Sequence, residues 1–189
     1  RISNRGRKLL LLNYILSIVL KCGKIFYKKD MRMQRESLEG CRSMRTYEVL
    51  LIARYIIEHE FKCNRSVSNL RLQKLLYFVQ LYFLMCRNTP CFNAKMEAWD
   101  FGPVVPEVYH KYKRFGSMII QEIDHSAHSE ISSDDRILID DMLDECANKT
   151  TRDLVEITHQ QSPWKNAYRN PITNEIPLDS IRELVSKVG

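Results

Sequence analysis

Apolar residues recur at helical spacing over the first part of the chain beyond residue 44. The segment Thr46–Phe61 follows the i, i+3, i+4, i+7 repeat of a helix with one buried stripe, formed by Val49, Ile52, Ala53 and Ile56. The next segment, in which Ser68 or Asn69 can cap a helix that runs to about Arg87, is apolar nearly all round. Arg71, Lys74 and Gln80 interrupt it, so its apolar runs are too short for a membrane span. We predict two consecutive helices, of which the second is the central helix of the fold.

The pattern changes after residue 90. Phe92–Phe101 has the aromatic, alternating character of one or two short strands, and Gly102-Pro103 predicts a turn after it. Pro103 or Pro106 then fits the first turn of a third helix, where a missing N–H leaves no hydrogen bond unmade, and Gly116 ends that helix. Its apolar positions are Val105, Val108, Tyr109 and Tyr112.

A strand and a loop are predicted next. Met118–Ile123 has the composition of a strand, and His125–Ser133 is polar enough for a surface loop. Ser132 or Ser133 can begin the following helix, with Asp134 and Asp135 complementing its N-terminal dipole. The acidic residues of this helix fit its solvent face and lack the glycine-bearing loop of a calcium site, so no metal is expected there.

Three more helices complete the pattern. Thr150 with Asp153 predicts a capped helix through Gln160, Ser162-Pro163 begins a short helix with Trp164, and a last helix carries Ile181, Leu184, Val185 and Val188. The expected fold is mainly α: a compact multi-helix domain around a central apolar helix. A small β element lies between its second and third helices.

Charge divides the 189-residue chain into two parts. Residues 1–43 hold 11 Lys or Arg and three Asp or Glu, a balance of +8, whereas the remainder holds 18 and 20, a balance of −2. Because the basic charge lies outside the predicted domain, the domain cannot gain affinity for nucleic acid by neutralising phosphate groups. We therefore expect no nucleic-acid partner for residues 44–189.

Residues 1–43 form a segment of their own. A basic start and an apolar run from Leu9 to Leu20 resemble a signal peptide, but no small-x-small cleavage site follows and the run is short for a membrane span. We interpret this segment as upstream sequence read in frame, with Met44 as the start, or as a disordered basic leader. An export or membrane signal and a genuine N-terminal helix are the alternatives.

Few residues suggest a catalytic or metal-binding site. The six cysteines form neither C-x-x-C pairs nor zinc-ligand spacing with histidine, so we interpret them as free thiols in a reducing cytoplasm. No nucleophile elbow, zinc-protease helix, P-loop or dinucleotide motif is present. His110 and His159 are the histidines that lie near other notable residues, and a hydrolase or transferase that uses one of them is an alternative hypothesis. We expect no cofactor, no metal and no enzymatic activity.

The segment Glu97–Tyr112 packs aromatic residues, a turn and a helix start into sixteen residues. This combination suits a rigid corner, in which Trp99 and Tyr109 are either core residues or interface anchors. The pattern alone favours the core interpretation.

Three motifs resemble one family. They are LRLQKLLYFVQ at 70–80, then EAW at 97–99 with GPVVP at 102–106 and Tyr109, and finally LVEITHQ at 154–160 with PWK at 163–165. In this order they resemble the Panacea domain, also called the SocA-like antitoxin domain, over residues 44–188. The resemblance implies a cytoplasmic bacterial or prophage antitoxin that neutralises a toxin encoded next to it by direct binding.

The resemblance also implies two further points. At least one member type is an adaptor that delivers its toxin to an ATP-dependent protease, so proteolytic delivery is an alternative to masking. The family has no agreed catalytic residues to carry over. The candidate motif and partner-contact residues are Trp99, Asp100, Tyr109, His110, Tyr112, His159 and Trp164.

Overall fold

A computed structural model describes residues 46–187. The interpretations of residues 1–43 lie outside this range. Within it, no helix combines the length and apolar character that crossing a membrane requires.

Two consecutive helices confirm the first hydrophobic pattern. Helix α2 spans Val49–Lys62 and begins three residues after Thr46, because the chain at Tyr47 is extended and its N–H donates to the carbonyl of Cys91. Helix α3 spans Asn69–Arg87. Its N-terminal cap is Ser68, whose side chain accepts from the N–H of Arg71 at 3.3 Å, as predicted.

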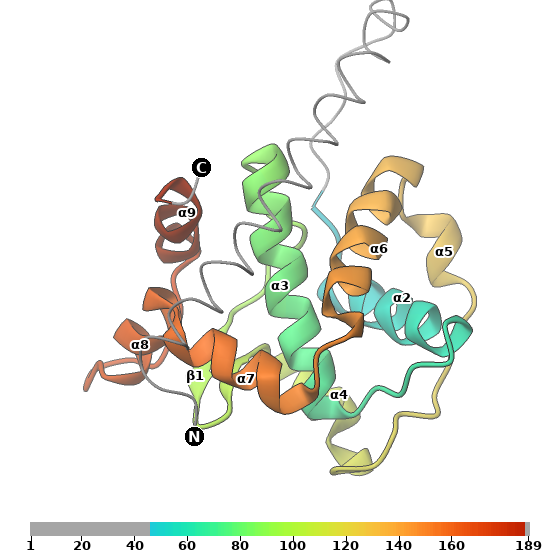
Figure 1. The fold of residues 1–189 in the computed structure, drawn as a ribbon, viewed down its shortest axis with the longest axis horizontal. Helices are drawn as coiled ribbons and strands as arrows, with labels where there is room; N and C mark the ends of the chain where they lie inside the picture. The colour runs from blue at the N-terminus through green and yellow to red at the C-terminus, as the bar shows by residue number, and fades with distance from the viewer. Residues whose placement is uncertain (1–45, 188–189) are drawn as a thin grey trace, which may run out of the picture.

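Helix α3 is the central helix, as its apolar circumference predicts. It packs against α2, α4, α6, α7, α9 and strand β2, and nearly all of its side chains are buried. Figure 1 shows α2, α5 and α6 on one side of α3 and α8 and α9 on the other. The core therefore surrounds one helix.

The predicted β element is a two-stranded antiparallel hairpin. Strand β1 spans Glu97–Trp99, strand β2 spans Gly102–Val104, and Trp99 pairs with Gly102. The turn therefore lies at Asp100-Phe101, and the predicted turn at Gly102-Pro103 is wrong. Gly102 has a φ of 98° within β2, which a residue with a side chain rarely adopts.

The segment that follows the hairpin is helical, as predicted. Helix α4 spans Pro106–Tyr112 with Pro106 in its first turn, the 3₁₀ turn η1 spans Lys113–Phe115, and Gly116 ends it at a φ of 54°. Met118–Ile123 is not a strand. Its contact with Val67 and Ser68 is one short bridge, because it meets the α2–α3 loop and not a neighbouring strand.

Most of the chain from residue 125 onward is helical. The segment His125–Ser133, predicted as a loop, contains the short helix α5 (Ala127–Glu130). Helices α6 (Ser133–Ala147) and α7 (Thr151–Gln160) begin at the predicted caps Ser132 and Thr150, the latter in a capping box with Asp153. Two shorter helices follow, α8 (Ser162–Tyr168) and α9 (Leu178–Ser186).

Two expectations about individual side chains need correction. Asp135 is buried and not solvated, because it accepts a 2.5 Å hydrogen bond from the Tyr47 hydroxyl and pairs with Arg87. Cys63 and Cys91 carry free thiols, as expected, whereas Cys86 is disulfide-bonded.

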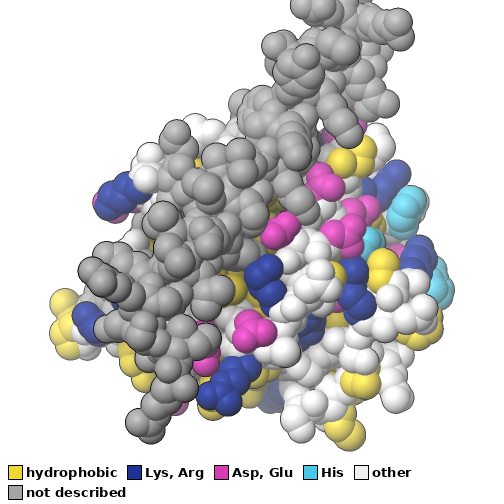
Figure 2. Space-filling view, viewed as in Figure 1, with side chains coloured by type: hydrophobic (Ala, Val, Ile, Leu, Met, Phe, Trp, Pro, Cys, Tyr) yellow, Lys and Arg dark blue, Asp and Glu magenta, His cyan; other side chains and the backbone are white. Residues whose placement is uncertain are grey.

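Acidic and basic side chains are interspersed on the face shown in Figure 2. This mixture agrees with the balance of −2 for residues 44–189.

Candidate functional site

The three sequence motifs converge in space. We define the motif junction as the contact zone of three segments: residues 73–77 of α3, the hairpin with its continuation to Val105, and residues 158–168 of α7 and α8. Strand β2 packs on α3 and α7, and α8 packs on β1. Segments separated by up to 95 positions along the chain thus form one structural unit.

Lys74 holds the hairpin from the α3 side. Its side chain is 0% exposed, and its Nζ donates a 2.6 Å hydrogen bond to the carbonyl oxygen of Pro103. Lys74 makes no ion pair within residues 46–187, and burial lowers its pKa to about 7. A buried ammonium group with one carbonyl partner is therefore close to losing its proton at neutral pH.

Gln73 fixes the end of the hairpin. Its Oε1 accepts from the N–H of Val105 at 2.8 Å, and its Nε2 donates to Oδ1 of Asn69. Asn69 in turn donates to the carbonyl of Tyr109. These bonds satisfy buried polar groups and hold the passage from β2 into α4 against α3.

A stack of three rings holds the hairpin from the other side. The His159 and Trp164 rings are stacked with centroids 4.0 Å apart, and the Trp164 and Tyr168 rings with centroids 4.6 Å apart. Trp164 donates from Nε1 to the carbonyl of Trp99 at 2.9 Å, and the Tyr168 hydroxyl donates to Oδ1 of Asp100 at 2.9 Å. The start of the turn is thus tied to α8.

Trp99 and Tyr109 extend the aromatic contacts. Their rings meet edge to face with centroids 4.8 Å apart, and the Trp99 Nε1 donates to Oε2 of Glu97 at 2.8 Å. Both residues are half-buried. They belong to the packing of the corner and still reach its surface.

The remaining predicted site residues divide into two groups. Tyr112, the last residue of α4, is buried in the core, and burial raises the pKa of its hydroxyl to about 12. His110 is exposed on α4, where its ring meets that of Tyr109. Trp99, Asp100, Tyr109, His159 and Trp164 are therefore the predicted residues that the fold brings together around the hairpin.

Neither candidate histidine has a preassembled catalytic arrangement. Between residues 46 and 187, neither the His110 nor the His159 ring is hydrogen-bonded to a hydroxyl or thiol group. The pKa of His159 lies below its ordinary value because of burial and the nearby charge of Lys74, so its ring is neutral at pH 7. No three His, Cys, Asp or Glu side chains in the described part of the chain are placed to hold a metal ion.

Comparison with known proteins identifies the scaffold. The family described as "Antitoxin SocA-like, Panacea domain" matches residues 72–165, which include α3 from Leu72, the hairpin, α7 and the start of α8 as far as Lys165. The chain is 29% identical over 136 residues to Antitoxin SocA of Caulobacter vibrioides (strain NA1000 / CB15N), covering 65% of this chain and 71% of the relative. The chain belongs to the SocA-like Panacea domain family. No solved structure gave a significant match.

Sequence reasoning missed several residues of this Panacea domain junction. Lys74 and Gln73 lie on a helix that is apolar nearly all round, and a lysine at such a position is a signal of a buried polar contact. Tyr77 also has its hydroxyl buried, where it donates to Oε1 of Gln161. Phe101 and Tyr168 carry no signal in the sequence pattern, because their positions depend on where the turn lies.

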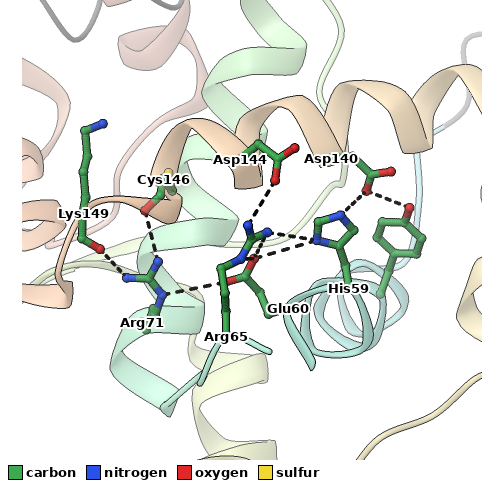
Figure 3. Close-up of polar contacts among 9 residues, drawn as sticks. His59, Glu60, Arg65, Arg71, Asp140, Asp144, Cys146 and Lys149 are labelled. Carbon is green, nitrogen blue, oxygen red and sulfur yellow. Dashed lines mark hydrogen bonds and ion pairs between the residues drawn. The ribbon is translucent and has the colours of Figure 1, made fainter. Parts of the chain in front are cut away.

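A second polar cluster lies at the α2–α3 connection of the Panacea domain (Figure 3). Glu60 is 0% exposed and pairs with Arg65 at 2.7 Å, and Arg65 reaches Asp144 of α6 at 3.1 Å. Arg71 donates to the carbonyls of Cys146 and Lys149 at the end of α6. Together these contacts join α2, the α2–α3 loop and α3 to α6, so the cluster stabilises the helical packing.

Proposed function

We propose that this chain is the antitoxin of a bacterial or prophage toxin–antitoxin pair and that it neutralises the toxin encoded by the neighbouring gene through direct protein–protein binding. The similarity to Antitoxin SocA, together with the family match that overlaps all three motifs, carries the proposal. The rigid motif junction supports binding, since a preformed surface loses little conformational entropy when a partner docks.

Co-expression tests the proposal. The neighbouring open reading frame is expressed from an inducible promoter, alone and together with this chain, and colony formation is counted. We expect the neighbour to arrest growth alone and the pair to restore it. A neighbour that is harmless alone, or that remains toxic beside this chain, would contradict the antitoxin function.

Masking and proteolytic delivery predict different toxin lifetimes. In the masking mechanism, which we propose, the toxin half-life stays unchanged while growth is rescued. In the adaptor alternative, the half-life shortens only in strains that contain the ATP-dependent protease. Pulse-chase measurement in strains with and without that protease separates the two.

We propose binding and not catalysis for the histidines. The alternative is a hydrolase or transferase that uses His110 or His159. Replacing both by Gln should leave neutralisation intact, because neither ring contacts a hydroxyl or thiol group within residues 46–187. Loss of neutralisation in a variant that keeps the wild-type melting temperature, with toxin binding unchanged, would favour the catalytic alternative. We place this activity in the cytoplasm, where the toxin is made.

A further inference from the structure

Phe101 is an exposed aromatic side chain at the turn of the hairpin. It is 65% exposed, and the neighbouring ring of Tyr168 is 47% exposed. Asp100 connects the two residues: it directly precedes Phe101 in the chain, and its carboxylate accepts a hydrogen bond from the Tyr168 hydroxyl. A single exposed apolar residue is common, but a large aromatic side chain in a fixed position is the kind of residue that anchors protein interfaces.

The main chain on both sides of Phe101 is fixed. Two residues before it, the Trp99 carbonyl accepts from Trp164, and two residues after it, the Pro103 carbonyl accepts from the buried Lys74. The N–H of Val105 donates to Gln73. Helices α3 and α8 therefore fix the backbone that carries Phe101, and docking this ring costs little backbone entropy.

Other exposed apolar side chains lie away from the hairpin. Phe61, 58% exposed, lies in the last turn of α2, where the chain enters the loop to α3. Met118 and Ile119 lie between η1 and α5, where one short bridge holds the segment. A few large, rigidly held side chains carry most of the energy of protein interfaces, which favours Phe101 over Met118 and Ile119.

The charge beside Phe101 indicates the chemistry of the partner. Asp100 is exposed and makes no ion pair in the part of the chain that the structure describes. Its Oδ1 accepts from Tyr168, and its hydrogen bond and charge raise the pKa of the Tyr168 hydroxyl. A carboxylate without a cation next to an apolar ring is complementary to an apolar pocket with an Arg or Lys at its rim.

We infer that Phe101 is the anchor residue through which this chain binds its toxin, and that the toxin supplies an apolar pocket for the ring with an Arg or Lys facing Asp100. This inference rests on the proposed antitoxin function. The aromatic stack of His159, Trp164 and Tyr168 then has a positioning role, because it holds the turn in place and need not contact the toxin.

The test uses the full chain and the purified product of the neighbouring gene, the latter carrying an inactivating substitution. Binding is measured by calorimetry for wild type, Phe101→Ala and Phe61→Ala, which matches Phe101 in residue type and exposure. We expect Phe101→Ala to weaken binding roughly 30-fold or more and Phe61→Ala to change it less than about threefold. Melting temperatures should be unchanged in both variants.

Two further measurements make the result independent of folding. A photo-crosslinking amino acid at position 101 should capture the purified toxin, and the same group at position 61 should not. Asp100→Asn should weaken binding about three- to tenfold and reduce its dependence on salt, because one charge pair is lost.

The outcomes separate this inference from the antitoxin function. Wild-type affinity in Phe101→Ala, or a crosslink at position 61 and none at position 101, overturns the anchor and leaves the antitoxin function intact. A wild-type chain that neither binds nor neutralises the neighbouring product overturns both.

Discussion

Gly102 lies so close to Thr158 that a Cβ atom on Gly102 would be 2.6 Å from the Thr158 Oγ1. The same Cβ would lie 2.8 Å from Nζ of Lys74. Thr158 is buried, and its hydroxyl already donates to the carbonyl of Val155, so it has little freedom to move aside. The absence of a side chain at Gly102 is thus what allows the hairpin to contact both α3 and α7.

The first prediction concerns this contact. Gly102→Ala should lower the free energy of unfolding by about 2–4 kcal/mol, because a steric clash adds to the backbone strain of a φ of 98°. Gly116→Ala is the matched control, since its φ is 54° but no atom lies within 4 Å of its Cβ position. Strain alone should cost about 1–2 kcal/mol there. Equal costs in urea unfolding would show that the close contact is unimportant.

The second prediction concerns Lys74 and pH. Burial lowers its pKa from 10.5 to about 7, so the folded protein binds fewer protons than the unfolded chain between these values. Stability must therefore rise with pH above 7, by up to about 1.4 kcal/mol per pH unit. Lys74→Met removes this titration. The difference in unfolding free energy between wild type and Lys74→Met should grow by about 1–2 kcal/mol in favour of wild type from pH 7 to 8.5.

The comparison with the Met variant isolates Lys74. Other groups, such as the buried Cys91 thiol, whose pKa is raised by burial, titrate in the unfolded chain at similar pH and affect both proteins equally. A difference that stays constant between pH 7 and 8.5 would mean that Lys74 keeps an ordinary pKa.

The third prediction separates the hydrogen bond of Trp164 from its ring. Trp164→Phe keeps a stacked ring between His159 and Tyr168 but removes the donor to the Trp99 carbonyl, and should cost about 1 kcal/mol. Trp164→Ala removes the stack as well and should cost about 3–5 kcal/mol. Both are measured by thermal unfolding. A Phe variant as unstable as the Ala variant would show that the hydrogen bond dominates.

The fourth prediction concerns the buried carboxylate of Figure 3. Burial by itself raises the pKa of Glu60, but hydrogen bonds from His59 and Arg65 and the charges of Arg65 and Arg71 outweigh it, so the net shift is downward. Glu60→Gln removes the charge that these arginines face and should cost about 3–5 kcal/mol at pH 7.

The pH dependence of Glu60 follows from the sign of its shift. A carboxyl group with a lowered pKa stabilises the fold above its unfolded value of 4.5, and this stabilisation is lost as pH falls through the folded pKa. Wild type should therefore lose its advantage over Glu60→Gln below pH 4.5. Asp144→Asn is the control, since Asp144 is 61% exposed and its loss should cost less than about 1 kcal/mol. Equal losses of stability from the two substitutions at pH 7 would contradict the role of Glu60 as the carboxylate that stabilises this cluster.

Local signals explain which parts of the fold the sequence predicts. Helix α3 and the caps Ser68, Ser132 and Thr150 depend on residues at most four positions apart, and all were predicted from spacing. The hairpin turn was misplaced because Gly-Pro is typical of turns. At Gly102, the reason for glycine is a contact with Thr158, 56 positions further along the chain.

The candidate site was predictable only in part for the same reason. The aromatic residues Trp99, Tyr109 and Trp164 stand out in the sequence, and the fold brings them to one corner. The apolar surroundings of Lys74 on its helix signal a buried contact, but its partner lies 29 positions away. Asp135 is buried through a partner 88 positions away, and no local pattern distinguishes it from a solvated charge. Phe101 became notable only when the turn was located.

The hairpin is held mainly through its main chain. Lys74 and Trp164 contact carbonyl oxygens, and Gln73 contacts an N–H, so these bonds do not depend on which side chain occupies position 101. A single substitution at the turn can therefore change the side chain exposed at position 101 without unfolding the domain. A scaffold built in this way can acquire a new partner in evolution by small steps, while the residues that define its family remain unchanged.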